Sequence, residues 1–221
     1  MTQSGILYTA EMDLPDADIE PFLAWYAFRH APDLYQAGFH VCTCYRAVEG
    51  DMNILDVYQA ASPDVFTSPV YRSMMANDPY GRELMLRRRN KAHTIYAQLA
   101  GAPLTNCQAA KLDADWVSLI HFAAQEVVAA EIAEFMVADG DLIAPAAKSW
   151  RLAHRTADHP TNTTFRPRCL LLIEWGERPP PHVRPAKHLQ DRCGGEVSQM
   201  DSFVGYRIYP WPNRKPAGLG G

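Results

Sequence analysis

The order of strand-like and helix-like segments repeats along the chain, and this repeat constrains the fold more than any other feature of the sequence. An apolar, aromatic-rich run at 5–12 predicts a first strand, and a matching run at 116–123 follows about 110 residues later. The last strands predicted in the two halves, at 92–99 and 203–209, are separated by the same interval. Self-similarity at one fixed period indicates two copies of one structural unit.

Each half has the order strand, helix, strand, strand, helix, strand, which is the ferredoxin-like unit. We therefore predict an α+β protein with two tandem units, at 1–104 and 113–221, packed sheet to sheet and joined by a linker at 101–114. Between the outer strands of each half, the predicted elements are helices at 18–31, 62–89, 126–136 and 188–192, and strands at 40–48, 53–60, 148–155 and 168–175.

The composition is that of an ordinary globular protein, with 48% hydrophobic and 21% charged residues and a net charge of −4. The basic cluster at 87–91 follows apolar residues and is typical of a solvated helix face, so we expect no nucleic-acid partner. The longest apolar run, 169–173, is too short to cross a bilayer, and the N-terminus has no signal-peptide pattern. We expect a cytoplasmic protein without a membrane partner.

Motifs that would hold a metal or a cofactor are missing from the sequence. The five cysteines form an odd set without framework spacing, and neither CxxC nor HxxxH occurs, so no metal site is predicted. There is no glycine-rich phosphate loop, Rossmann fingerprint or Ser-His-Asp order. We therefore expect no cofactor.

His30 is the leading candidate for an acid–base group. Counting back from it, Tyr26, Leu23 and Ile19 fall at spacings of four, seven and eleven, which places His30 on the apolar stripe of its helix. A histidine directed inward beside Tyr26 and His40 is suited to proton transfer in an apolar pocket. The alternative is a core histidine bonded to a backbone carbonyl.

Strand alternation adds further candidates. His40 shares a strand face with two cysteines, His93 shares one with Ile95, and His121 shares one with Leu119. For each of these histidines a structural role is the competing interpretation. Tyrosines in strands are candidates to line a pocket, although aromatic residues in strands are usually core. The tyrosines concerned are Tyr8, Tyr45 and Tyr58, whereas His154, His159, His182 and His188 lie in predicted loops or helices and are expected at the surface.

The first hundred residues carry a motif set that resembles a known superfamily. A helix with WYxxxH-x-P is followed by a Gly-Phe pair, a strand, a hairpin, a second strand and SPxYR. This arrangement is similar to the dimeric α/β-barrel superfamily, and within it to the EthD-like branch. The residues that carry the resemblance are Trp25, Tyr26, His30, Pro32, Gly38, Phe39, Tyr45, Arg46, Tyr58, Ser68, Pro69, Tyr71 and Arg72.

The resemblance implies two ferredoxin-like units that pack sheet against sheet, here within one chain, with an apolar pocket in each unit. Members include muconolactone isomerases, cofactor-free polyketide cyclases and quinone-forming monooxygenases. They commonly use a pocket histidine, which by motif position is His30, sometimes with a tyrosine. Two departures are notable. Arg29 stands where related sequences often carry an acid, and the predicted helix at 126–136 has no histidine.

We therefore expect a cofactor-free enzyme that performs isomerisation, cyclisation, dehydration or lyase chemistry on a small oxygenated metabolite. Two alternatives remain open: a cofactor-free monooxygenase acting on a phenol, and a non-catalytic small-molecule-binding protein. The long connection at 156–167 predicts a mobile loop beside a cavity. Exposed edge strands could pair with those of a second copy, so a homo-oligomer is possible. The predicted catalytic residues are His30, Tyr26 and His40, and the predicted substrate-binding residues are Trp25, Tyr8, Tyr45, Tyr58, His93 and His121.

Overall fold

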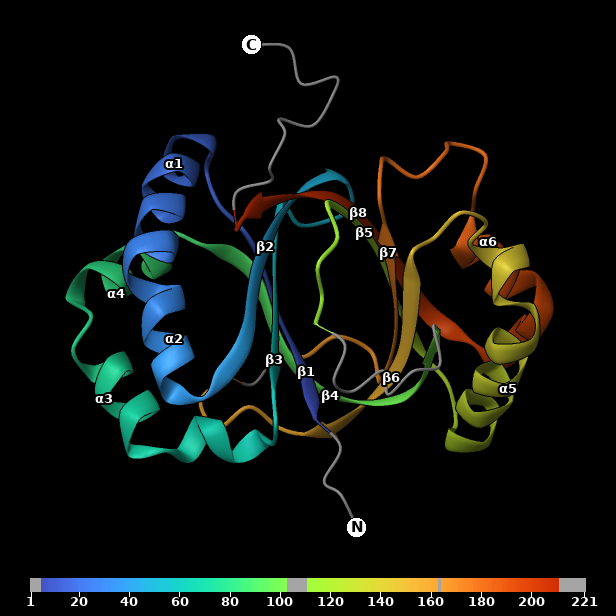
Figure 1. The fold of residues 1–221 in the computed structure, drawn as a ribbon, viewed down its shortest axis with the longest axis horizontal. Coiled ribbons are helices and arrows are strands. Elements are labelled where there is room, and N and C mark those ends of the chain that lie inside the picture. Colours follow the sequence, from blue (N-terminus) through green and yellow to red (C-terminus); the bar gives the residue numbers. More distant parts are fainter. Residues whose placement is uncertain (1–4, 103–110, 163, 211–221) are drawn as a thin grey trace.

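The computed structural model describes residues 5–102, 111–162 and 164–210 of the chain. Eight antiparallel strands in these ranges close into a barrel in the order β1-β3-β2-β8-β5-β7-β6-β4, with helices on two opposite outer sides (Figure 1). The elements of the first half are β1 Ile6–Asp13, α1 Asp16–Trp25, η1 Tyr26–His30, α2 Ala31–Ala37, β2 Phe39–Glu49, β3 Ile54–Ala60, η2 Pro63–Thr67, α3 Pro69–Ala76, α4 Pro79–Leu86 and β4 Arg89–Ala102.

The second half repeats the order of the first with fewer helical segments. In both halves the first and third strands lie at the centre of a group of four, because the groups run β4-β1-β3-β2 and β8-β5-β7-β6. The elements of the second half are β5 Trp116–Ala123, α5 Glu126–Ile143, β6 Ser149–Ala157, β7 Cys169–Trp175, α6 Pro185–Cys193, η3 Gly194–Glu196 and β8 Ser198–Tyr209.

The two halves are joined by hydrogen-bonded strand pairs, not only by the packing of one sheet on another. β2 pairs with β8, and β4 pairs with β6. We predicted exposed edge strands; instead the edges pair and satisfy their backbone groups, which closes the barrel. Because each of the eight described strands has two neighbours, strand edges give no structural basis for self-association.

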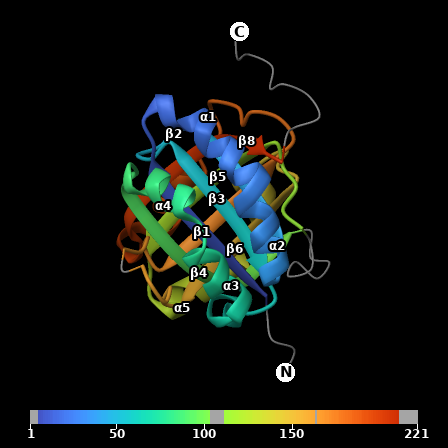
Figure 2. The same cartoon turned by 90° about the vertical axis from the view of Figure 1, so that its left-hand side faces the viewer.

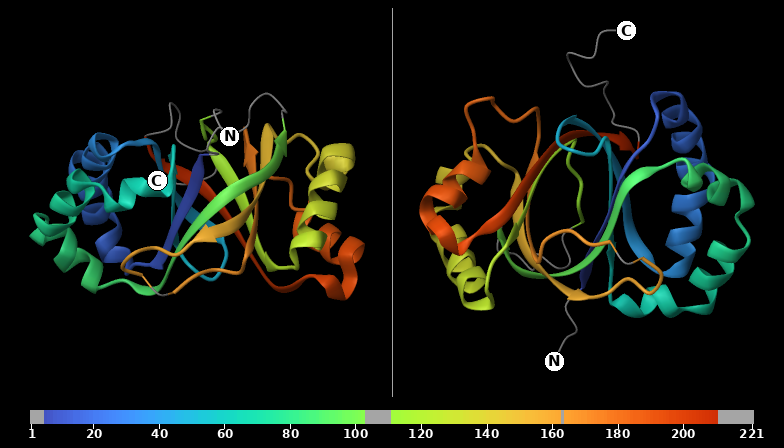
Figure 3. Two further views of the ribbon diagram at one scale, coloured as in Figure 1. Left: turned by 90° about the horizontal axis from the view of Figure 1, so that it is seen from below. Right: turned by 180° about the vertical axis from the view of Figure 1, so that it is seen from behind.

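Alternation along the strands divides the apolar side chains among three clusters. One fills the barrel, and the other two lie outside it, under the helices of the first and second halves. Figures 2 and 3 show the barrel and these helices from other sides. Part of the predicted linker also fills the barrel: Leu112 and Ala114 are buried there, and the Tyr45 hydroxyl donates to the Ala114 carbonyl at 3.2 Å. Residues 103–110 of that linker lie outside the described part.

The first helical segment is longer than its sequence pattern predicts. We expected it to end at Ala31, before Pro32, yet the helical segment continues to Ala37 and is closed by Gly38, whose φ of +109° is accessible mainly to glycine. Since Pro32 has no N–H to donate, the helix cannot pass it with regular bonding. The helix instead widens into the π-helical turn η1 just before Pro32. Such π turns are frequent at functional sites. His30 is the last residue of this turn.

Candidate active site

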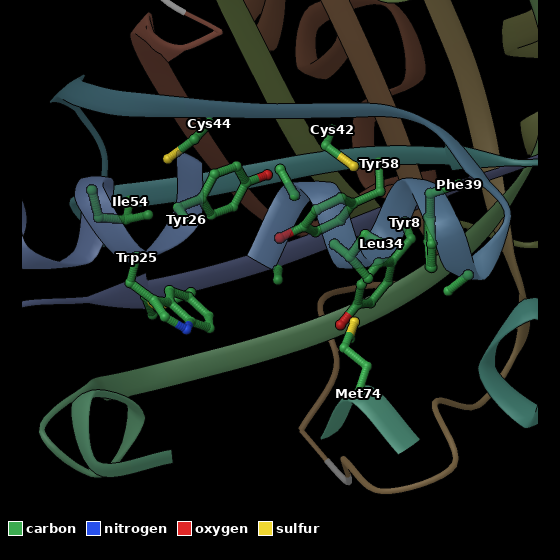
Figure 4. Packing of buried hydrophobic residues seen from close by; sticks show 14 of the residues in the cluster. Tyr8, Trp25, Tyr26, Leu34, Phe39, Cys42, Cys44, Ile54, Tyr58 and Met74 are labelled. Carbon is green, nitrogen blue, oxygen red and sulfur yellow. The ribbon is translucent and has the colours of Figure 1, made fainter. Parts of the chain in front are cut away.

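A cavity of about 320 Å³ lies on the outer face of the first-half strands. The helical segments α1 to α4 surround it, and aromatic side chains form much of its wall, as the close view in Figure 4 shows for Tyr8, Trp25 and Tyr58. Five of the residues that the sequence indicated as site candidates line this cavity: Tyr8, Trp25, His30, Tyr58 and His93.

The imidazole of His30 is held between aromatic rings. It stacks on Trp25 with ring centroids 4.4 Å apart, and the Trp25 indole N–H donates to Oδ2 of Asp78 at 2.6 Å. Asp78 also caps α4 by accepting from the Gly81 N–H at 2.8 Å. Burial lowers the pKa of His30 to about 4, although the carboxylate of Asp78 acts in the opposite direction. The ring is therefore neutral at pH 7 and has a lone pair available for a proton.

We predict that Gly81→Ala disrupts this corner of the pocket. A Cβ on Gly81 would lie 2.6 Å from Nε1 of Trp25 and even closer to Oδ2 of Asp78, so α4 would have to move away from α1. We expect a loss of about 1–3 kcal/mol in unfolding free energy, measured by urea denaturation. Gly195→Ala is the control, because a Cβ there meets nothing within 4 Å. Equal stability of the two variants would contradict this packing.

A buried carboxyl group lies behind His30. Nε2 of His30 is 3.5 Å from the Tyr58 hydroxyl, and Asp56 precedes Tyr58 by two residues on the same strand face. Burial raises the pKa of Asp56 to about 7, although hydrogen bonds from the Cys44 thiol and the Tyr58 hydroxyl lower it in part. Oδ1 of Asp56 has no hydrogen-bond partner in the described part of the chain. Asp56, Tyr58 and His30 thus form a chain of proton-transferring groups from the barrel wall to the cavity.

A second group of polar side chains combines Tyr8, His93 and Arg88. The Tyr8 hydroxyl is 2.6 Å from Nδ1 of His93, and a guanidinium nitrogen of Arg88 is 3.3 Å from Nε2 of the same ring. Guanidinium only donates hydrogen bonds, so Nε2 of His93 accepts and Nδ1 carries the proton. Burial, together with the nearby Arg88 charge, lowers the pKa of His93 to about 2, so the ring stays neutral.

The second half of the chain also contributes to the pocket. His159 and Asn162, from the loop between β6 and β7, line the cavity, which confirms the prediction that the segment 156–167 borders one. Its mobility stays a prediction. His159 was expected at the surface but is only 5% exposed, because its ring packs 5.0 Å from Phe66 and 5.5 Å from Tyr8, measured between centroids. Nδ1 of His159 accepts from the Thr161 backbone N–H, which places the ring proton on Nε2.

One arginine anchors this loop across the mouth of the barrel. Arg166 contacts Glu11 at 2.8 Å, Asp51 at 3.0 Å and Asp201 at 3.2 Å, and Glu11 is itself 1% exposed. The backbone gives further attachment, since the His93 N–H donates to the Thr164 carbonyl at 2.9 Å. The loop is therefore fixed to both halves of the barrel.

We predict that Arg166→Met loosens the loop. The variant would leave the carboxylate of Glu11 buried without its guanidinium partner, which we expect to cost roughly 1.5–3 kcal/mol in unfolding free energy. Faster hydrogen–deuterium exchange should appear at the backbone around His159, measured by mass spectrometry. Arg192→Met, which removes a cation–π contact with Phe135 outside this loop, is the control. Unchanged exchange in Arg166→Met would show that the arginine does not hold the loop.

Four predicted site residues do not line the cavity. His40 is the extra residue of a β-bulge between Phe39 and Val41. The bulge interrupts the alternation of side chains between the two strand faces, and the side chain of His40 points to solvent. Tyr45 and His121 lie inside the barrel, where His121 lies between Asp201, at 2.8 Å, and Glu11. Tyr26 is fully buried behind His30, and its hydroxyl donates to the Thr43 carbonyl at 3.3 Å.

Sequence reasoning missed several residues that the fold brings to the pocket, among them Asp56, Asp78, Arg88 and His159. Asp56 had a usable signal, because an acidic residue is unfavourable inside an apolar strand and shares a face with Tyr58. Arg88 was missed because the basic cluster at 87–91 was interpreted as a solvated helix face. His159 lies about 130 residues from His30, and the length of its loop indicated a cavity nearby without indicating this histidine.

The described residues contain no group of three or more histidine, cysteine, aspartate or glutamate side chains arranged to hold a metal ion. No helix in the same ranges has the length and apolar character needed to cross a membrane.

Comparison with known proteins identifies the fold but no family. No family model and no curated protein sequence matches the chain. An anthrone oxidase-like protein of known structure aligns with a TM-score of 0.64 at 9% identity, over 98% of this chain and 97% of its own. A haem-binding protein from Thermus thermophilus gives 0.57 at 10% identity, over 92% and 91% of the two chains. A candidate monooxygenase from Lactobacillus acidophilus gives 0.54 at 9% identity, over 92% and 94%.

At these identities the likeness concerns the fold alone. The chain shares with these proteins the closed eight-stranded architecture of the dimeric α/β-barrel kind.

Proposed function

We propose that the protein is an enzyme that removes a proton from a small, largely apolar, oxygenated aromatic molecule bound in the first-half cavity. The observation that carries this proposal is the chain His30–Tyr58–Asp56 at the wall of an aromatic pocket. His30 takes the proton, and the carboxyl group of Asp56, acting through the Tyr58 hydroxyl, stabilises the imidazolium that forms. A side chain behind the base that orients and stabilises it is a recurrent arrangement in general-base catalysis.

Abstraction of a proton from a carbon next to a carbonyl group leaves an electron pair that moves onto the carbonyl oxygen as an enolate. Return of the proton to a different atom completes an isomerisation, and the same enolate is the starting point for cyclisation or elimination. An electron-rich enolate or phenolate also reacts with dioxygen, so the proposal includes a cofactor-free monooxygenase as its second candidate. The names of the oxidase-like and monooxygenase neighbours favour that candidate. A non-catalytic binding protein is the third.

We further propose that the chain is a tandem repeat of two ferredoxin-like units, at 1–104 and 113–221, related to the EthD-like branch. The equivalent strand order of the two halves supports the repeat. Only the first unit would be catalytic, because α5 occupies the place of the histidine-bearing helix and has no histidine.

Haem, which one neighbour binds, is poorly matched to this cavity. An axial ligand needs a free lone pair on an imidazole, thiolate or similar group. Both nitrogens of His93 are hydrogen-bonded and Nε2 of His159 carries its proton, so among the three histidines that line the cavity only His30 keeps a free lone pair, the one that accepts the substrate proton. The volume of about 320 Å³ is also at the lower end of the range for small-ligand pockets. We therefore derive no step through haem.

Anthrone is a suitable probe, since its methylene carbon loses a proton to give the enol tautomer. We expect the protein to accelerate exchange of the methylene protons in deuterated water, followed by NMR without oxygen. With dioxygen present, the monooxygenase candidate predicts oxygen uptake and conversion of anthrone and O₂ to anthraquinone and water. Saturable binding of anthrone without either reaction would favour the binding protein. Heat-denatured protein gives the uncatalysed background.

A further inference from the structure

Arg88 is a half-buried cation without a counter-ion. Its guanidinium group lines the cavity, yet no carboxylate in the described part of the chain lies within the 4 Å expected of an ion pair. The partners recorded for it are neutral, namely Nε2 of His93 at 3.3 Å and the sulfur of Met85 at 3.6 Å. The adjacent Arg87, by contrast, contacts Asp18 at 2.6 Å. A partly desolvated charge is costly unless it is paired, so a bound anion would compensate Arg88.

Arg88 also determines the direction of a hydrogen-bond chain. The guanidinium donates to Nε2 of His93, Nδ1–H of His93 donates to the Tyr8 oxygen, and the Tyr8 proton is left to donate elsewhere. Burial raises the pKa of Tyr8 well above its ordinary range, so this hydroxyl keeps its proton. Hydrogen bonds in such a chain polarise one another, which makes the last donor stronger. Tyr8 and Met74, both labelled in Figure 4, line the same cavity.

His159 adds a third donor from the other half of the protein. Nε2 carries the ring proton, is buried and has no hydrogen-bond partner among the described residues. The ring lies 5.5 Å from those of both Tyr8 and His93. An unsatisfied buried donor calls for a ligand acceptor.

The carboxylates that line the same cavity do not satisfy these donors. Asp78 accepts from Trp25 and Gly81. Asp56 accepts from Cys44 and Tyr58. This end of the cavity therefore presents donors and positive charge, whereas aromatic and aliphatic side chains line most of the remainder.

We propose that the substrate is an aromatic organic anion, a phenolate, enolate or carboxylate, whose charged oxygen is bound by Arg88, Tyr8 and His159. The donors would stabilise negative charge on the oxygen of an enolate as it develops, which is the role of an oxyanion hole. Arg88 and Tyr8 belong to the first half and His159 to the second, so the binding site is complete only when both halves are folded together. The inference depends on the proposed function only in placing the substrate in the same cavity.

The test uses 4-nitrophenol, whose neutral and ionised forms absorb at different wavelengths, and 4-nitroanisole, which cannot ionise. We expect the 221-residue protein to bind the phenolate at least tenfold more tightly than the anisole. Because the anisole stands in for the neutral phenol, this preference corresponds to a decrease of about one unit or more in the pKa of the bound phenol. In Arg88→Met the preference should fall to about twofold or less while 4-nitroanisole still binds, which shows that the pocket remains folded. Arg89→Met, which removes an exposed charge one residue away, should keep the preference.

Unchanged selectivity in Arg88→Met, or equal binding of both probes by the unmodified protein, would overturn the inference. Failure of both probes to bind would overturn it as well. His30→Gln should retain anion selectivity, which separates this inference from the catalytic proposal. A pocket that selects the anion without exchanging substrate protons rejects the catalytic proposal alone, whereas proton exchange without anion preference rejects the anion site alone.

Discussion

Replacing His30 with glutamine is expected to lower the rate of anthrone proton exchange by about 10²–10⁴-fold, the usual contribution of a general base. Glutamine keeps a polar side chain of similar length but cannot take up a proton. We expect unfolding free energy to fall by only about 1–2 kcal/mol, within the usual range for point mutants, since His30 faces a cavity and its recorded polar contact, with Tyr58, is long at 3.5 Å. Exchange is measured by NMR, and stability by urea denaturation.

The matched control is His40→Gln, which makes the same substitution on the exposed bulge of β2. It should retain the full rate. If His30→Gln keeps its activity, a different group removes the proton, and if it unfolds, His30 is structural. Either outcome rejects the catalytic assignment of His30.

The rate should also depend on pH in a way that identifies Asp56. His30 has a pKa of about 4 and is already neutral at higher pH, whereas the carboxyl group of Asp56 ionises near pH 7. Because an ionised Asp56 stabilises the imidazolium, we expect the exchange rate to rise as the pH passes through 7. Asp56→Asn should remove this rise.

Asp56→Asn is expected to make the folded protein more stable at pH 8 than the unmodified chain. The folded-state pKa of Asp56 is raised from its ordinary 3.8 to about 7, so the folded state holds the proton more tightly than the unfolded state. The stability that this protonation provides is fully present below pH 3.8 and is lost as the pH rises through 7. Each pKa unit corresponds to 1.36 kcal/mol, so the loss of stability approaches about 4 kcal/mol.

Asparagine stays neutral, so the difference in unfolding free energy between Asp56→Asn and the unmodified chain should be greatest at pH 8 and vanish near pH 4. Urea denaturation at several pH values measures it. Asp16→Asn is the control, because that carboxylate is 89% exposed and its pair with Arg46 lies at the surface. If the difference in unfolding free energy for Asp56→Asn does not change with pH, burial does not raise the pKa of the Asp56 carboxyl group.

Local patterns in the sequence predicted the elements and one side of the pocket. The apolar, aromatic-rich run at 5–12 predicted the first strand, and Tyr8 on that strand, a candidate to line a pocket, does line the cavity. The helical stripe directed His30 toward the interior, and the structure places it at the cavity. The length of the loop at 156–167 predicted its place beside a cavity. Each of these inferences depended only on neighbouring residues.

Other features depend on contacts between residues far apart in the chain. The bulge at His40 breaks the alternation by inserting one residue, and only the pairing of β2 with β3 reveals it. Closure of the barrel through β2–β8 and β4–β6 places Tyr45 and His121 inside it. The sequence does not indicate which strands of the two halves pair with each other.

The sequence by itself determined which residue types were available: an imidazole on an apolar stripe, tyrosines in strands and a basic cluster. Only the tertiary structure determined their chemistry. Asp56 acquires a pKa near 7 because packing removes water from it, Arg88 lacks a counter-ion because no described carboxylate folds within reach, and His159 enters the pocket because Arg166 fixes its loop across the barrel. Burial and charge pairing are properties of the space around a side chain, and that space is formed by residues distant in sequence.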